Sequence, residues 1–219
     1  MQKENNIRIK NIILDLGGVI FDVSYEAAAN AYIKLGIKNF DELFSKKKQE
    51  HFFDDYEKGI ISDEDFRNEI RKHISTPVTD GQIDDAWNAL LFTIPAARMK
   101  FVQSLKKHYN LFLLSNTNGI HLKEVKKILE KDFGKNVLES VFKKMYFSCE
   151  LKMRKPETEI FNFVVQGNNL KKEETIFIDD SIQHVEGAKK AGLPAFHLDL
   201  SKNTLETFLP EILAENFKL

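Results

Sequence analysis

Short apolar runs alternate with segments of helical spacing along much of this chain. Four runs have strand character and end near Asp15, Ser115, Ser148 and Asp180, and a weaker fifth run, PAFHLDL, follows Gly192. From about residue 95 onward the segments between them have apolar residues three and four apart: PAARMKFVQSLKKHY, GIHLKEVKKILEKDF, PETEIFNFVVQG and SIQHVEGAKKAG. Strands that are apolar on both faces and separated by helices are typical of a parallel sheet covered on both sides. This alternation therefore predicts an α/β fold.

The stretch from about residue 24 to residue 92 breaks the alternation, because several helical patterns follow one another without a convincing strand. Tyr25–Leu35 is predicted to be one helix that ends at Gly36. Ser62 is predicted to be an N-cap, with Asp65 three residues later. The segment IDDAWNALL adds a further amphipathic helix. We therefore predict an all-helical insertion.

Two domains follow from this division. Residues 1–22 and 93–219 are predicted to form the domain that contains the sheet, and residues 23–92 a small helical domain. The aromatic residues of KKKQEHFFDDYEKG are expected to pack into the interior of the helical domain, because aromatic side chains are mostly buried. Several aromatic residues there are also candidates for contact with a ligand: Phe44, Phe52, Phe53, Tyr56, Trp87 and Phe92.

The charge balance excludes one broad class of function. The chain has 32 Lys and Arg against 33 Asp and Glu, which gives a net charge of -1. It therefore lacks the positive field that nucleic-acid binding normally needs.

The start has no signal-peptide pattern, and no apolar run approaches the roughly 20 residues of a membrane helix. The single cysteine, Cys149, cannot form an internal disulfide. We therefore expect a cytoplasmic protein.

Polar residues stand at the ends of three predicted strands: Asp15, then Ser115 and Asn116, then Asp179 and Asp180. The carboxyl ends of parallel strands meet at one edge of the sheet, which is where ligands bind. Converging carboxylates repel one another unless a divalent cation lies between them. The pattern therefore predicts a site for a hard metal ion, with magnesium the expected one.

At these residues the chain resembles the haloacid dehalogenase superfamily. Asp15 in IILDLGGVI, Ser115 in LFLLSNTN, Lys155 in SCELKMRKPETEIF, and Asp179 and Asp180 in IFIDDSIQHVEGAKKAGL match its four motifs in order and spacing. The resemblance extends over most of the chain. It implies a Rossmann-like three-layer core with a parallel sheet, and a helical cap inserted between the first and second motifs.

The resemblance implies a phosphatase that acts on a small phosphorylated metabolite, such as a sugar phosphate. Asp15 would attack phosphorus to form an aspartyl-phosphate, which water then hydrolyses. Magnesium would be held by Asp15, the backbone carbonyl of Gly17 and the pair Asp179 and Asp180.

The resemblance also implies which residues bind the phosphate. Ser115 would donate a hydrogen bond to a phosphoryl oxygen, helped by the backbone around Asn116, and Lys155 would bring a positive charge to the phosphate and the nucleophile. Lys152 and Arg154 are the alternative cations of this cluster, and nothing in the sequence explains Lys152.

The chain departs from the family pattern at Gly17. Most members have a second aspartate there, which serves as general acid and base and is worth about 10²–10⁴-fold in rate. Asp22, His184, a residue of the insertion or an ordered water are candidates to replace it. Alternatively, the substrate has a good leaving group, or activity is weak.

Four rival functions remain open at this stage. A haloacid dehalogenase also lacks the second aspartate but needs no metal, which leaves Asp179 and Asp180 without a purpose. A phosphomutase normally relies on the proton shuttle missing at Gly17. A receiver domain has its acidic pair before the acceptor aspartate, not after it. A catalytically silent metabolite-binding protein would keep the fold without turnover. The sequence predicts no oligomeric state.

Overall fold

The computed structural model describes residues 8–37, residue 40 and residues 51–217. In this part of the chain five parallel strands form one sheet in the order β3-β2-β1-β4-β5. The predicted parallel sheet is confirmed, although β3 ends one residue early because Ser148 begins a helix. The strand bounds are β1 Asn11–Leu14, β2 Asn110–Ser115, β3 Lys144–Phe147, β4 Thr175–Asp179 and β5 Ala195–His197.

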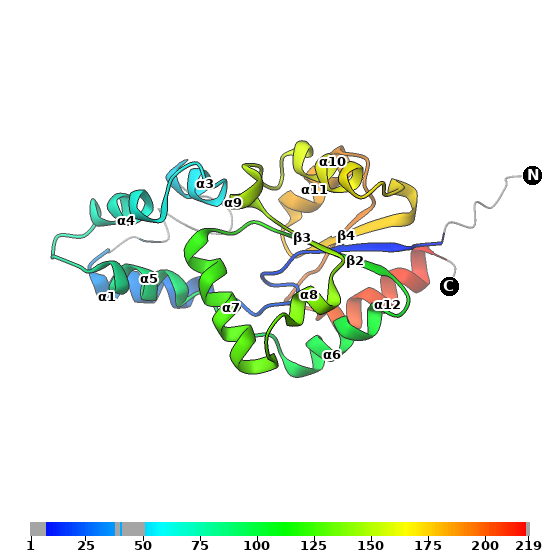
Figure 1. The fold of residues 1–219 in the computed structure, drawn as a ribbon, viewed down its shortest axis with the longest axis horizontal. Helices are drawn as coiled ribbons and strands as arrows, with labels where there is room; N and C mark the ends of the chain where they lie inside the picture. The colour runs from blue at the N-terminus through cyan, green and yellow to red at the C-terminus, as the bar shows by residue number, and fades with distance from the viewer. Residues whose placement is uncertain (1–7, 38–39, 41–50, 218–219) are drawn as a thin grey trace, which may run out of the picture.

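Helices cover both faces of the sheet, as Figure 1 shows. In β1, the side chains of Ile12 and Leu14 pack on one face and that of Ile13 packs on the other, because successive residues of a strand point to opposite sides. The helices on the Ile13 side are α10 (Thr158–Gly167) and α11 (Ile182–Lys190). Those on the opposite side are α6 (Ala96–Leu105), α7 (Gly119–Phe133), α8 (Val137–Val141) and α12 (Leu205–Asn216). The three-layer α/β architecture is therefore confirmed.

Residues 23–92, called the insertion below, lie between β1 and β2 in sequence, and the regular elements of its described residues are helices. The helices described there are α1 (Tyr25–Leu35), α3 (His51–Glu57), α4 (Asp63–Arg71) and α5 (Asp80–Asn88), at the left of Figure 1. Gly36 ends α1 with a left-handed φ of 107°, and Ser62 caps α4 in a reciprocal pair with Asp65. Both predictions from helix-end signals are confirmed.

The insertion has a hydrophobic interior of its own. Trp87, Phe66 and Phe53 are almost completely buried in it, and Trp87 stands 5.2 Å from Phe66 between ring centres. Phe53 and Tyr56 are buried, and Phe52 packs against the same cluster, so their predicted role in packing is confirmed. Phe44 lies outside the described residues.

Four of the described elements lie outside the predicted pattern: the short elements α8, α9 (Ser148–Leu151) and the 3-10 helix η1 (Lys172–Glu174), and the longer helix α12. Helix α12 buries Leu205, Leu209 and Leu213 at a spacing of four, but Pro210 within it weakens the helical signal. Within the described residues no helix combines the length and the apolar character needed to cross a bilayer.

Two adjacent chain segments join the insertion to the rest of the molecule, which is called the sheet region below. The backbone N–H of Asp22 donates to the carbonyl of Thr93 at 2.9 Å, and that of Phe92 donates to the carbonyl of Asp22 at 3.1 Å. Val23 and Leu91 form a further bridge. The outgoing and returning segments therefore support each other at the point where the insertion begins.

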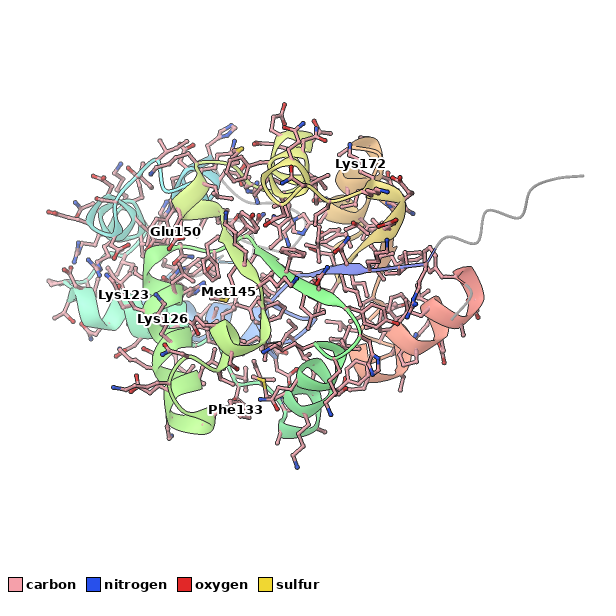
Figure 2. The ribbon with its side chains drawn as sticks, turned by 45° about the vertical axis from the view of Figure 1, so that its right-hand side comes forward. Lys123, Lys126, Phe133, Met145, Glu150 and Lys172 are labelled. Atoms are coloured by element: carbon pink, nitrogen blue, oxygen red, sulfur yellow. The ribbon has the colours of Figure 1, made fainter. Side chains whose placement is uncertain are left out.

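The opposite end of the insertion docks on α7. The hydroxyl of Tyr56 donates to Asp63 Oδ1 at 2.9 Å and accepts from the backbone N–H of Ile120 at 3.2 Å. Lys123, labelled in Figure 2 on α7, donates to Asp63 Oδ2 at 2.8 Å. A Cβ at Gly119 would lie 2.5 Å from Asp63 Oδ1, so a larger residue there would displace the Asp63 carboxylate. The insertion is thus held at both ends over the carboxyl edge of the sheet.

Candidate active site

Three neighbouring strands bring polar side chains to one edge of the sheet. Strand β1 lies between β2 and β4, so Asp15, which follows β1, stands between Ser115 at the end of β2 and Asp179 at the end of β4. Asp15 is 7% exposed, Ser115 3% and Asp179 not at all. Asp180, the next residue, is partly exposed at the same edge. The predicted site residues of the strand ends therefore lie together.

Lys155 is completely buried at the centre of this group. Its Nζ donates to Asp15 Oδ1 and to Asp179 Oδ2, each at 2.6 Å, and to the carbonyl of Leu114 at 3.0 Å. The three donors of the ammonium group are thus all used. Among the three cations predicted as alternatives, Lys155 is the one that contacts the strand-end carboxylates.

Asn116 fixes the backbone of Lys155. Its side-chain amide donates to the carbonyl of Lys155 at 2.9 Å and accepts from the backbone N–H of Lys155 at 3.0 Å. Both ends of the amide are therefore engaged with the chain. Asn116 therefore positions Lys155, and the same two hydrogen bonds fix the orientation of the Asn116 side chain.

Burial affects the two carboxylates that share Lys155 differently. Burial raises the pKa of Asp15 to about 8, with Lys155 opposing the shift and Asp179 and Asp180 adding to it. Burial acts on Asp179 as well, but Lys155 and His184 outweigh it and hold the pKa of Asp179 below its usual range. His184 Nδ1 lies 3.0 Å from Asp179 Oδ2. Asp179 is therefore ionised, whereas Asp15 needs further positive charge nearby to be ionised at neutral pH.

The carboxylates form a group that fits a cation. Asp15, Asp179 and Asp180 each offer one oxygen, and these oxygens lie within 4.8 Å of one another. Gly18 has a left-handed φ of 81°, and a Cβ there would lie 2.3 Å from Asp180 Oδ2. The turn after Asp15 therefore admits the Asp180 carboxylate only because it contains glycine.

A cavity of about 930 Å³, counted out to its open mouth, lies over these residues. The sheet region forms its floor with Asp15, Ser115, Lys155 and Asp180. The insertion contributes to its roof with side chains that include Tyr25, Glu57, Trp87, Leu90 and Leu91. The site is therefore a pocket between the sheet region and the insertion.

Two predicted residues lie elsewhere. Asp22 does not line the cavity, and its Oδ1 accepts from Arg98 Nη1 at 2.6 Å. It is therefore engaged in an ion pair rather than placed to exchange protons with a substrate. Lys152 also lies outside the cavity, in a left-handed conformation with φ 60°, and donates to the carbonyl of Gly59 in the insertion. Its contact joins the two regions.

Among the aromatic candidates that the structure describes, Trp87 alone lines the cavity. Residues that the sequence analysis did not single out also line it, notably Tyr25, Glu57 and His121. No local pattern marks Glu57 among the 33 acidic residues of the chain. His121 follows the α7 N-cap Asn118 by three residues, which places it on the first turn but gives no sign of its role.

Comparisons with known proteins agree on one family. A family model described as a haloacid dehalogenase-like hydrolase matches residues 9–192. A curated relative, the D-ribitol-5-phosphate phosphatase of Bacteroides thetaiotaomicron, is 31% identical over 188 residues, which are 86% of this chain and 91% of the relative.

Solved structures give the same picture. A haloacid dehalogenase family enzyme of Bacteroides thetaiotaomicron, in complex with magnesium and inorganic phosphate, has a TM-score of 0.81 and 36% identity over 91% of this chain and 99% of its own. A hydrolase of this type from Porphyromonas gingivalis has a TM-score of 0.80 and 32% identity over 94% and 97% of the two chains. Both relatives share more than 30% sequence identity with this chain, so the similarity extends beyond a shared fold.

Proposed function

This chain belongs to the haloacid dehalogenase-like hydrolases, and we propose that it is a magnesium-dependent phosphatase of a small polyhydroxy metabolite, with Asp15 as its nucleophile. One observation carries the reaction type: a fully buried lysine joins Asp15 to Asp179 where adjacent strands end. A phosphoryl group brought to this place meets a carboxylate, a cation and the hydroxyl of Ser115 together.

The donor set fits magnesium. Its members are carboxylate oxygens, which this ion prefers, and the group carries more negative charge than Lys155 offsets. We assign Asp15, Asp180 and the carbonyl of Gly17 as the residues that would hold the ion, with Asp179 supporting them. Magnesium, when bound, lowers the repulsion between the Asp15 carboxylate and the phosphate, and it favours the ionised form of Asp15.

The chain's own residues carry the two steps. In the first step a bond forms between an Asp15 oxygen and phosphorus, the ester P–O bond breaks, and the leaving oxygen takes up a proton. In the second step water attacks phosphorus and gives up a proton, which replaces the one used in the first step, while the bond to Asp15 breaks and inorganic phosphate leaves. Lys155 orients the carboxylate and offsets charge on the phosphoryl group. Ser115 and the backbone around Asn116 orient the phosphoryl oxygens.

The proton for the leaving oxygen has to come from a group other than residue 17, which is glycine. Asp22 is excluded from that role by its place outside the cavity and its ion pair with Arg98. The cavity wall includes His184 and Tyr25, each of which carries an exchangeable proton in one of its states. A substrate with a good leaving group lowers the demand on these residues.

The location of the substrate's carbon chain follows from the architecture. We propose that residues 1–22 and 93–219 are the catalytic domain and that residues 23–92 are a cap, since the two linking segments support each other and the far end docks on α7. A phosphate on the floor then directs the rest of the substrate towards the roof. We further propose a cytoplasmic enzyme whose substrate resembles the ribitol phosphate in the name of the relative.

Phosphate release from a panel of substrates tests this function. The panel contains ribitol 5-phosphate, other polyol and sugar phosphates, and an aryl phosphate, each with magnesium and with EDTA. We expect turnover that EDTA abolishes and magnesium restores, with polyol phosphates preferred. Chloride release from a haloacid without metal would instead support a dehalogenase. No turnover by folded protein that still binds phosphate would support a silent binding protein.

A further inference from the structure

Glu57 is fixed over the phosphate-binding edge of the sheet. It is the last residue of α3, and its side chain is 15% exposed and lines the cavity. Its backbone carbonyl accepts from Ser148 Oγ at 2.6 Å. Ser148 is fully buried and also accepts from the backbone N–H of Thr117 at 2.9 Å. The backbone of Glu57 is therefore tied, through Ser148, to the loop that directly follows Ser115 at the end of β2.

Arg154 holds the carboxylate of Glu57 from the opposite side. Its Nη2 lies 2.7 Å from Glu57 Oε2, and its Nη1 donates to Asp54 Oδ1 at 2.7 Å. Arg154 directly precedes Lys155 and also lines the cavity. The loop that delivers the buried lysine to the nucleophile therefore orients Glu57 as well.

This pair has unused hydrogen-bonding capacity inside the cavity. Glu57 Oε2 lies 2.7 Å from Arg154 Nη2, whereas Glu57 Oε1 is not among the buried atoms and has no hydrogen-bond partner among the described residues. Arg154 Nε is buried without an acceptor. Because Glu57 lines the cavity, a carboxylate oxygen without a protein partner can accept a hydrogen bond from a ligand there. The missing partner of Glu57 is a hydrogen-bond donor.

Resting on the proposed function, we propose that Glu57 accepts hydrogen bonds from hydroxyl groups of the substrate's carbon chain. It thereby selects phosphate esters whose carbon chain carries hydroxyl groups and no charge of its own. Arg154 is the positioning residue. Because Arg154 offsets its charge, Glu57 is suited to a neutral hydroxyl rather than to a cationic amine. A substrate with a second anionic group at this place is repelled by Glu57.

The test compares two substrates in the same enzyme preparations. One is ribitol 5-phosphate, and the other is an aryl phosphate that has no hydroxyl groups. A hydrogen bond to a charged partner is worth about 10- to 100-fold in affinity, so Glu57→Ala is expected to lower kcat/KM for the polyol phosphate by about that factor, through KM. The aryl phosphate is expected to be turned over nearly as fast as by the wild type.

Further variants separate binding from structure. Glu57→Gln keeps one acceptor oxygen and is expected to be intermediate, and it serves in place of Glu57→Ala if that variant does not fold. Arg154→Lys is expected to raise KM for the polyol phosphate while leaving the aryl phosphate unchanged. Asp55→Ala is the matched control, because it removes a carboxylate from α3 outside the cavity and is expected to leave the substrate ratio unchanged.

A phosphorylated sugar acid supplies a second readout. For the wild type, kcat/KM is expected to be lower with the sugar acid phosphate than with the polyol phosphate. In Glu57→Ala the difference between these two kcat/KM values is expected to be smaller. Equal losses for polyol and aryl phosphates in both Glu57 variants, or an unchanged ratio, overturn the proposal while leaving the phosphatase function intact. Absence of phosphate release from every substrate in the wild type overturns the proposed function, and the inference about Glu57 with it.

Discussion

At the floor of the cavity Lys155 is completely buried between Asp15 and Asp179, whereas at the junction with the insertion Lys123 is 69% exposed beside Asp63. Both contacts are lysine–aspartate ion pairs with distances below 3 Å. The buried group is interdependent, because removing one charge leaves another without compensation in a medium that solvates it poorly. The exposed pair is replaceable, since water solvates either partner alone. We therefore expect substitutions in the buried group to impair the enzyme strongly. Substitutions in the exposed pair that docks the insertion should be tolerated.

The strongest test of the comparison is Asp15→Asn. The amide has nearly the shape of the carboxylate but is a poor nucleophile, so we expect phosphate release to fall by at least about 10⁴-fold while the fold persists. Circular dichroism and a phosphate-release assay with magnesium measure the two effects. Asp22→Asn is the control, since Asp22 follows the same strand but lies outside the cavity, and it is expected to retain most activity. Comparable losses in both variants would falsify the assignment of the nucleophile.

A second test compares the two lysines directly. Lys155→Met leaves two buried carboxylates without their cation and is expected to lower the free energy of unfolding by about 3–5 kcal/mol. Lys123→Met removes the exposed partner of Asp63 and is expected to cost less than about 1 kcal/mol. Urea denaturation of both variants without magnesium measures the difference. Similar midpoints for the two variants would contradict the expected difference between the buried and the exposed lysine.

A third test separates the insertion from the sheet region. A Cβ at Gly59 would lie 2.3 Å from the backbone carbonyl of Cys149, so Gly59→Ala forces the two regions apart. Misplacement of about 1 Å costs up to about 10²-fold in rate, so we expect a loss of roughly 10- to 100-fold in kcat/KM. The sheet itself should stay intact.

The control for this variant has the same backbone strain without the close contact. Gly192 has a φ of 77°, against 61° at Gly59, and its nearest neighbour is the flexible Lys172 at 3.7 Å. Gly192→Ala is expected to lose some stability but to keep its kcat/KM. If both glycine variants lose activity alike, strain rather than docking explains the effect.

A fourth test concerns a dependence of stability on pH at the junction. His121 stacks on Trp87 at 4.6 Å, and burial lowers its pKa from 6.5 to about 4. The unfolded chain therefore binds a proton below pH 6.5 that the folded chain refuses until about pH 4, so stability falls as the pH decreases through this window. At pH 5 the loss is about 2 kcal/mol relative to pH 7.

Urea denaturation at pH 7 and pH 5 measures this loss. His121→Gln cannot titrate, but its amide can still donate towards the carbonyl of Trp87, which His121 Nε2 contacts at 3.1 Å. The variant is expected to lose less stability than the wild type between the two pH values. An equal loss in both proteins assigns the pH dependence to other groups.

Local pattern predicts the sheet, its helices and the strand-end residues of the site. Apolar runs mark the strands, and parallel strands carry their last residues to one edge whatever the sequence distance between them, so Asp15, Ser115 and Asp179 are found without knowledge of any contact. Helix-end chemistry likewise marks Gly36 and Ser62, because caps depend on residues within a few positions of each other. Lys155 is found through its motif.

Only the tertiary structure determines which residues form the roof of the cavity. The Arg154–Asp54 pair spans 100 positions, and the Arg98–Asp22 pair spans 76. Neither pairing follows from periodicity, because each depends on how the insertion and the helices dock. Docking results from many contacts, and no single residue type indicates which residues will meet. The sequence therefore determined where the phosphate chemistry lies, whereas tertiary packing decided that Glu57 faces it and that Asp22, paired with Arg98 of α6, does not.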